Sequence, residues 1–439
     1  MECAATFDFV LEETPQIFYS HYMNAKAGAF KNPIVSKILF AFVIVASILL
    51  SACHKERTSP QVEMETLFEL NYGNFEDELN AFEIPSAGRI RISVEMRDGF
   101  FYILNGEAKK IMELNSYGDL LALYYNESDN PRPSFAPLEL TPNINSTKTA
   151  VPYAFNEATA IALDSRKYLY VADCLPQSRQ EVDPETNQVM SEIVVRFDGD
   201  KKFLNYIGRQ GLGGSPFPYI RDIFTTERDE LVVLCSTTTG FFVYWFSPEG
   251  YLLYSIPIEN SYVPNPYVGE KGETFFSLET IIPDLKERKL YLKVDYFASY
   301  IDESSRVQSG VEYFSTLVHP FDIEQRTFQT AIDVPPYAEV STDRFSNETY
   351  QIPYGFLGVT ETGWLCFIVS TQEGFRIQLV QENGQRILKR DIQMNRAETF
   401  FCDFDLSKEG IVSALIVRKE KALVCWWRLD SLLQALIKD

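Results

Sequence analysis

The residue types that most often carry chemistry are sparse in this chain of 439 residues. Its histidines are His21, His54 and His319. So few histidines disfavour a histidine-based zinc site, and a serine or cysteine protease triad would need His319 as its base. The seven cysteines include no CxxC pair, which argues against a thiol-redox or cysteine–metal motif. Cys235, Cys366 and Cys425 lie inside apolar runs and are predicted to be buried small hydrophobic residues.

Carboxylates are the other candidates for chemistry. Asp403 and Asp405 are two residues apart in a strand-like segment, which places both side chains on one face. Together with Glu95 and Asp284 they could line a central channel and hold Ca²⁺, whose ligands are oxygen atoms. A hydrolase built on such a metal also needs nearby Asn or His partners, and none is identifiable. We therefore expect no cofactor, and keep Ca²⁺ as the alternative.

Composition and charge narrow the functional classes. Lys and Arg number 40 and Asp and Glu 61, which gives a formal net charge of −21. This balance argues against a nucleic-acid binder and disfavours docking by charge on an anionic membrane. Hydrophobic residues make up 46%, enough for a large core, and the 14% of aromatic residues favours strands over helices.

The amino-terminal region has the pattern of an export signal. An apolar run over residues 38–50 follows Lys26, Lys31 and Lys37 and is too short to span a membrane. It ends in Leu-Ser-Ala followed by Cys53, which resembles the bacterial lipobox, in which the cysteine receives a diacylglycerol. We expect residues 1–22 to be a non-native extension, 23–52 a signal peptide, Cys53 the lipidated (diacylglycerol, palmitate) residue and 53–64 a flexible tether.

The rest of the chain repeats one unit six times. Apolar second strands recur at 99–104, 167–173, 230–235, 289–294, 364–369 and 410–415. Third strands follow at 110–118, 194–200, 242–250, 316–324, 377–384 and 423–430. The spacing between these two strands is similar in four copies, and the other two carry polar insertions at 174–192 and 295–309. A unit this short buries its faces only by stacking on further copies.

This repeat predicts an all-β fold over residues 65–439: a six-bladed β-propeller of four-stranded antiparallel blades. The sixth copy contains only three strands, so we expect residues 66–72 to supply its outer strand and close the ring. The tail from Asp430 has leucines at helical spacing and predicts a short helix beneath the ring.

Residues 162–173, 194–205 and 206–223 resemble an NHL-type repeat, with its strand hairpin, "FDxDG" turn and glycine-rich crossover. As a whole, residues 65–430 are similar to bacterial lipoproteins that carry a six-bladed NHL- or TolB-like propeller, mostly of unassigned function. The resemblance implies the fold and a location in the bacterial cell envelope, lipid-anchored on the periplasmic side or the cell surface. It does not imply an activity.

For function, we expect a non-enzymatic binding or assembly module that uses the loop-bearing face of the propeller. That face collects the polar residues Asn105, Asp173, Arg209, Ser236 and Asp295. The expected partner is a protein or glycan of the envelope, with the lipid anchor in the membrane. Two alternatives stay open: an axial-metal (Ca²⁺-type) hydrolase, lactonase or lyase, and carbohydrate or cell-wall binding through aromatic residues of the loops.

Overall fold

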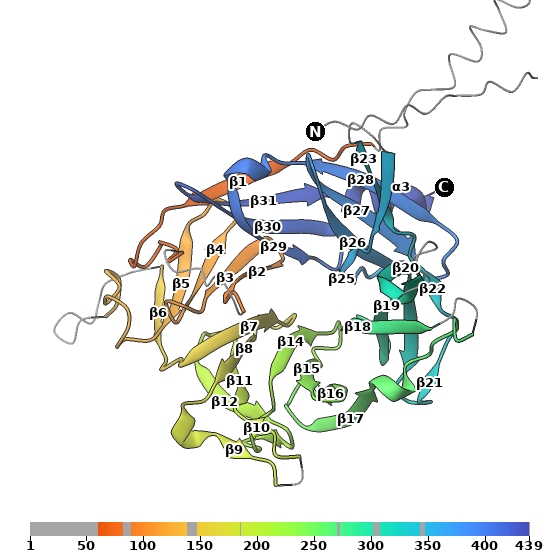
Figure 1. The fold of residues 1–439 in the computed structure, drawn as a ribbon. Helices are drawn as coiled ribbons and strands as arrows, with labels where there is room; N and C mark the ends of the chain where they lie inside the picture. The colour runs from red at the N-terminus through yellow and green to blue at the C-terminus, as the bar shows by residue number, and fades with distance from the viewer. Residues whose placement is uncertain are drawn as a thin grey trace, which may run out of the picture. The chain divides into compact units, whose positions relative to one another are not determined.

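Six β-sheets surround a central axis as the blades of a propeller (Figure 1). The computed structural model describes residues 60–81, 89–137, 147–184, 186–269, 273–301, 308–342 and 347–438. The predicted six-bladed all-β fold is confirmed, and within each blade neighbouring strands are antiparallel apart from the parallel addition of β6.

The first three blades follow one another along the chain. Blade one consists of β2 (Ile92–Arg97), β3 (Phe100–Asn105), β4 (Lys110–Asn115), β5 (Leu120–Tyr125) and the added β6 (Thr149–Pro152). Blade two consists of β7 (Glu157–Leu163), β8 (Leu169–Cys174), β11 (Glu192–Phe197), β12 (Phe203–Gly208) and the short β13 (Gly211–Leu212). Blade three consists of β14 (Ile220–Thr225), β15 (Leu231–Thr237), β16 (Gly240–Phe246) and β17 (Leu252–Glu259).

The other three blades complete the ring. Blade four consists of β18 (Thr274–Pro283), β19 (Lys289–Ile301), β20 (Gln308–Asp322), β21 (Thr327–Phe328) and β22 (Ile332–Asp333). Blade five consists of β25 (Gly355–Val359), β26 (Trp364–Thr371), β27 (Gly374–Gln381) and β28 (Ile387–Gln393). Blade six consists of β29 (Thr399–Leu406), β30 (Ile411–Arg418), β31 (Ala422–Arg428) and β1 (Glu65–Leu70).

The ring closes through strands from the two ends of the described chain. β1 pairs antiparallel with β31, so the predicted supply of the sixth blade's outer strand from the amino-terminal side is confirmed. The Trp426 indole N–H donates to the Glu65 carboxylate at 2.6 Å, and the Tyr72 hydroxyl donates to the Arg418 carbonyl at 2.5 Å. β1 thereby becomes the outer edge strand of blade six in place of β31.

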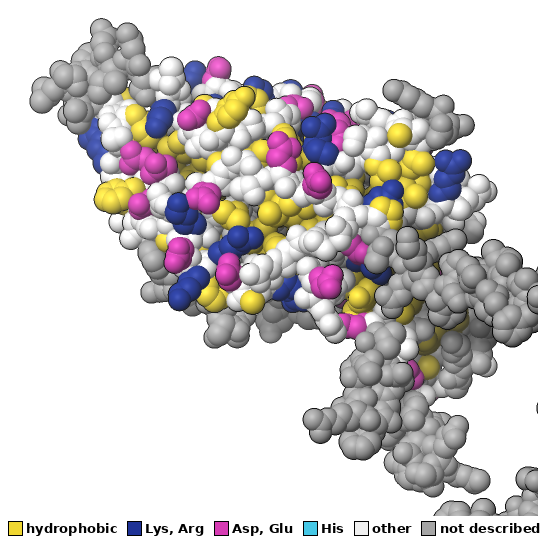
Figure 2. Space-filling view, turned by 90° about the horizontal axis from the view of Figure 1, so that it is seen from above, with side chains coloured by type: hydrophobic (Ala, Val, Ile, Leu, Met, Phe, Trp, Pro, Cys, Tyr) yellow, Lys and Arg dark blue, Asp and Glu magenta, His cyan; other side chains and the backbone are white. Residues whose placement is uncertain are grey.

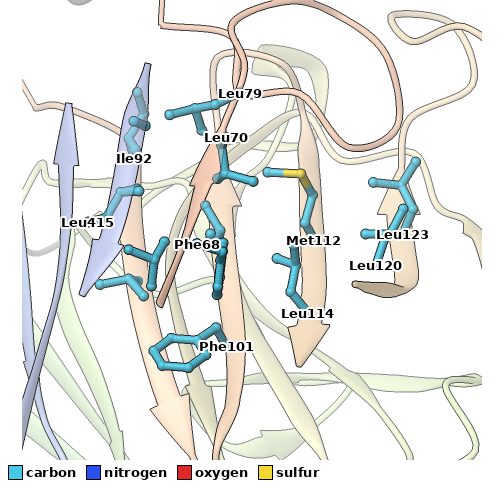
Figure 3. Packing of buried hydrophobic residues seen from close by; sticks show 14 of the residues in the cluster. Phe68, Leu70, Leu79, Ile92, Phe101, Met112, Leu114, Leu120, Leu123 and Leu415 are labelled. Carbon is cyan, nitrogen blue, oxygen red and sulfur yellow. The ribbon is translucent and has the colours of Figure 1, made fainter. Parts of the chain in front are cut away.

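The hydrophobic core lies between neighbouring blades. At the junction of blades six and one, Phe68 meets the Phe101 ring edge-on with 5.7 Å between ring centroids (Figure 3). Met112 and Leu415 are fully buried in the same cluster. The middle strands β3, β15 and β30 are mostly buried along their length, as expected for strands covered by a blade on both faces.

The two predicted insertions differ in structure. Residues 174–192 contain the 3₁₀ turn η1 (Gln177–Arg179) and a hairpin of β9 (Glu181–Val182) and β10 (Val189–Met190). The described ends of the range 295–309 belong to strands, because β19 runs to Ile301 and β20 begins at Gln308, and residues 302–307 are outside the described residues. Residues 296–301 of β19 pair with residues 308–315 of β20, which makes both strands longer than those of the other blades.

The remaining elements lie between blades or after the last one. The hairpin of β23 (Tyr337–Thr342) and β24 (Asn347–Ile352) connects blades four and five, η2 (Asn260–Tyr262) follows β17, and η3 (Arg396–Glu398) precedes β29. The predicted carboxy-terminal helix is α3 (Asp430–Lys438), whose Leu433 is buried against blade six. None of the described helices has the length and apolar character needed to cross a membrane.

The chain enters the propeller at blade five. Gln61 forms a parallel bridge with Asp391 of β28, and the Val62 N–H donates to the Asp391 carbonyl at 3.1 Å. Of the range predicted as a tether, the described part therefore lies along an outer strand. Residues 1–59, which include the predicted signal peptide and Cys53, are outside the described residues.

Candidate functional site

The axial channel is the candidate site. A cavity of about 440 Å³ is lined by residues from all six innermost strands: β2, β7, β14, β18, β25 and β29. The innermost strands of the six blades stand around the axis and do not pair with one another, so a channel remains between them. Its volume is within the range of small-molecule pockets in proteins.

Four carboxylates face this channel from three blades. Glu95 is on β2, Asp222 on β14, and Asp403 and Asp405 on β29. No ion pair is formed by any of the four with the residues that the structure describes. Asp222 was not among the predicted residues, because it is a single acidic residue on a short strand and no second acidic residue lies two positions away on the same face.

Asp403 and Asp405 have a structural role that their spacing explains. The Val94 N–H donates to Asp403 Oδ2 at 2.8 Å, and the Met96 N–H donates to Asp405 Oδ2 at 3.0 Å. Alternate N–H groups of β2 point away from β3, so an aspartate pair on β29 with the same two-residue spacing matches them. These bonds connect blade six to blade one along the channel wall.

Crowding in the channel changes the acidity of the four groups. Burial raises the pKa of Asp403 to about 7 and that of Asp405 to about 6, although hydrogen bonds from backbone N–H groups oppose the rise. The pKa of Glu95 is raised well above its usual value, first by burial and then by the charges of Asp405 and Asp222. Burial also raises the pKa of Asp222. Water still reaches the carboxylates, since the side chain of Asp222 is exposed within the channel.

The raised pKa of Asp403 predicts that this residue contributes to a pH dependence of the free energy of unfolding. Its folded pKa lies above the unfolded value, so between about pH 4 and pH 7 the unfolded chain binds fewer protons and stability falls as pH rises. Asp403→Asn keeps an oxygen acceptor for Val94 and removes the charge. In urea titrations across this range, the fall should be smaller than in the wild type. The exposed carboxylate of Asp200 provides the control: if Asp200→Asn flattens the profile equally, Asp403 is not a source.

The channel also contains cationic side chains, which bind carbonyl groups. Arg97 donates to the Leu163 carbonyl at 2.7 Å, and Arg89 donates to the carbonyls of Ile220 and Arg221 at 2.7 and 3.0 Å. Arg97 connects blade one to the adjacent blade two, Arg89 reaches from the start of blade one to blade three, and both are absent from the described ion pairs. Their positive charges oppose the rise in pKa of the carboxylates without forming close ion pairs with them: Arg97 acts on Glu95, and Arg89 and Arg221 act on Asp222.

The predicted calcium set is only partly assembled. Glu95, Asp403 and Asp405 reach the channel, whereas Asp284 lies in the turn after β18. Its carboxylate accepts from the Lys286 N–H at 2.8 Å and from the Tyr291 hydroxyl at 3.1 Å, which accounts for both oxygens. Among the described residues, no three His, Cys, Asp or Glu side chains converge closely enough to hold a metal ion.

Of the five polar residues predicted on the loop-bearing face, four have side chains bonded within the fold, and Ser236 is bonded through its backbone. Asn105 exchanges hydrogen bonds with the backbone of Asn80 at 2.8 and 3.2 Å. Asp173 accepts from the N–H groups of Asn156 and Glu157, which begin blade two. Burial raises the pKa of Asp173 to about 6. Both residues hold connections in place.

Arg209, Ser236 and Asp295 are held in the same way. Arg209 forms an ion pair with Asp183 at 3.6 Å, and the Ser236 N–H donates to the Tyr219 carbonyl at 2.9 Å. Asp295 forms a buried ion pair with Lys293 at 2.6 Å. His319 is buried, bonds the Tyr296 hydroxyl at 2.7 Å, and has its pKa lowered by burial to about 4, so it is neutral at physiological pH. These groups support the loops and leave the channel as the better candidate.

A second hollow of about 690 Å³ lies between blades five and six. Phe375, Met394, Phe400 and Phe404 line it, together with Arg396. Arg396 donates to the Thr371 carbonyl and lies 5.9 Å from the Phe375 ring centroid, so its charge is already engaged. Tyr262 of the predicted loop aromatics is exposed, whereas Phe155 and Phe217 are core residues.

Comparisons with known proteins find structural likeness only. No family model matches the chain, and no curated protein matches it. Among solved structures, the polysaccharide lyase Uly1 is 7% identical, with a TM-score of 0.39, over 84% of this chain and 100% of that one. A gluconolactonase from Xanthomonas campestris is 11% identical, with a TM-score of 0.36, over 84% and 97%. A protein of unknown function from Bacteroides caccae is 11% identical, with a TM-score of 0.36, over 77% and 95%. Likeness at this level gives no argument about activity.

Proposed function

We propose that this protein is a non-enzymatic binding module of the bacterial envelope and that its ligand, a small organic cation with amino groups, occupies the axial channel. The single observation that carries the proposal is the axial cavity with four carboxylates that lack ion pairs among the described residues. Crowded carboxylates with raised pKa values favour a ligand that brings positive charge, because binding it relieves their mutual repulsion.

An extended ligand fits the arrangement better than a single metal ion. The four carboxylates come from β2, β14 and β29 rather than meeting at one point, and the cavity of about 440 Å³ far exceeds the space of one ion. Amino groups spaced along a chain can each reach a separate carboxylate. Asp403, Asp405 and Asp222 each accept a backbone N–H, from Val94, Met96 and Ile223, which leaves Glu95 and the second carboxylate oxygen of the exposed Asp222 as the principal contacts.

Calorimetric titration of the purified protein with spermidine, and separately with CaCl₂, tests this proposal. We expect saturable one-to-one binding of spermidine with release of protons, because a cation displaces protons from the raised-pKa carboxyls; the measured heat should therefore differ between buffers of different ionisation enthalpy. The Glu95→Gln/Asp222→Asn variant should bind at least about tenfold more weakly, equivalent to about 1.4 kcal/mol.

The matched control is Asp200→Asn, which removes an exposed carboxylate outside the channel and should bind spermidine as the wild type does. Absence of spermidine binding, or equal binding by the double channel variant, would refute the proposal. Saturable binding of Ca²⁺ without spermidine would instead favour the axial-metal hydrolase or lyase.

The envelope location is the second part of the proposal and is supported by the sequence. The apolar run at 38–50 after three lysines, and the Leu-Ser-Ala-Cys end, are typical of lipidated secretory precursors. A diacylated cysteine at position 53 would hold the propeller on a membrane, because two acyl chains bind far more firmly than one. Its acylation is measured in the experiment described below.

A further inference from the structure

We propose that the outer edge of blade five, formed by β28 and residues 60–62, lies against an anionic lipid surface. This edge is called the β28 rim. The inference rests on the proposed acylation of Cys53 and adds to it the side of the propeller that faces the membrane.

The length of chain before the described residues restricts the geometry. Cys53 and Pro60 are seven residues apart in sequence. Seven residues span at most ~25 Å when fully extended. Pro60 is fixed on blade five, because the Asp391 N–H donates to its carbonyl at 3.3 Å and Val62 donates back to the Asp391 carbonyl at 3.1 Å. A lipidated Cys53 therefore keeps the membrane surface close to this blade.

The β28 rim is locally positive in a strongly acidic protein. The side chains of Arg386, Lys389 and Arg390 form no ion pair with the described acidic residues. The nearby carboxylate of Asp391 is already paired with Arg376, at 2.5 and 2.9 Å. Since side chains alternate along a strand, the three cations flank β28 on both sides.

Two further observations agree with a lipid partner. Ile387, between the cations, is an exposed apolar side chain at the start of β28. The pKa of Lys389 is lowered by burial and by the charge of Arg376, as expected in a region of positive potential. The side that is uppermost in Figure 1, on which β28 and β1 lie, has Lys and Arg side chains interspersed with Asp and Glu around apolar patches (Figure 2). A basic cluster beside a lipid anchor is the arrangement that anionic headgroups favour.

Lysine footprinting of the acylated full-length protein tests the inference. The protein is extracted from membranes and reconstituted into phosphatidylcholine vesicles with or without phosphatidylglycerol, and mass spectrometry reports acylation of Cys53 and methylation of each lysine. With phosphatidylglycerol, methylation of Lys389 should slow by about threefold or more, and high salt should restore it. Lys202, exposed on blade two, is the internal control and should not change.

The outcomes separate the two proposals. Acylated protein whose Lys389 is methylated equally in both vesicles overturns the β28 rim but leaves the anchor intact. Absence of acyl chains on Cys53 overturns both. The variant Arg386→Glu/Arg390→Glu should stay anchored and lose the protection of Lys389. If the protection persists in this variant, the lipid surface does not cover the β28 rim. If it appears only at protein concentrations at which copies cross-link, a second copy covers the β28 rim instead.

Discussion

Phe68→Ala is expected to destabilise the protein by about 3–5 kcal/mol, the usual cost of truncating a buried aromatic side chain. Phe68 is on β1, is 8% exposed, and packs edge-on against Phe101 of blade one. It also covers Gly118, whose Cα approaches the Phe68 ring so closely that an added Cβ would lie 2.8 Å from Phe68 Cβ. The cavity would therefore open at the junction where the ring closes. Urea unfolding followed by tryptophan fluorescence measures the loss.

Glu69→Ala is the matched control for the closing strand. Its carboxylate pairs with Lys421 at 2.7 Å, and both side chains are half exposed. Exposed ion pairs contribute little, so we expect a change below about 1 kcal/mol. Equal losses for Glu69→Ala and Phe68→Ala would show that strand pairing, rather than packing of Phe68, carries the closure.

The second large effect is expected at Gly240. Its φ is +150°, and a Cβ there would lie 2.2 Å from the Ile258 carbonyl oxygen, a backbone atom of the paired strand β17. Gly374 has the same environment in blade five, with φ +147° and a Cβ distance of 2.2 Å to the Ile392 carbonyl. Backbone strain and the clash together predict a loss of about 2–5 kcal/mol for Gly240→Ala.

Gly213→Ala separates strain from collision. Gly213 also has positive φ, +65°, but nothing lies within 4 Å of its added Cβ. Only the cost of a left-handed residue remains, about 1–2 kcal/mol. Thermal unfolding of the two variants should rank Gly240→Ala well below Gly213→Ala, and the reverse order would contradict the argument.

The architecture could be predicted because its signals are local and repeated. Each copy shows an apolar second strand, a turn and an apolar third strand, so six noisy patterns support one another. The shortage of one strand in the last copy also indicated β1 as the closing strand. The ends of the range 295–309 belong to strands rather than to a connection, because residues 296–301 are mainly aromatic or apolar and pair with β20.

The site was harder to predict, because it depends on which strand neighbours which. Asp403 and Asp405 carried a spacing signal that places them on one face, and they do reach the channel. Asp222 joins them only because β14 is an innermost strand, which no local pattern around it reveals. Asp284 is also an acidic residue next to a predicted strand, yet its carboxylate accepts hydrogen bonds from Lys286 and Tyr291 in the turn after β18. Asn105 likewise bonds Asn80, and the spacing of residues in the sequence does not reveal that the segment around Asn80 passes next to it.

The pairing of β1 with β31 has a consequence for how the molecule is made. Residues 65–70 must wait for residues 422–428 before their backbone groups find a partner, so almost the whole chain has to emerge first. Blades one to five can assemble on the way, but blade six remains incomplete until residues 422–428 have been made. The closed ring, and with it the pairing of β1, therefore forms in a late step of folding.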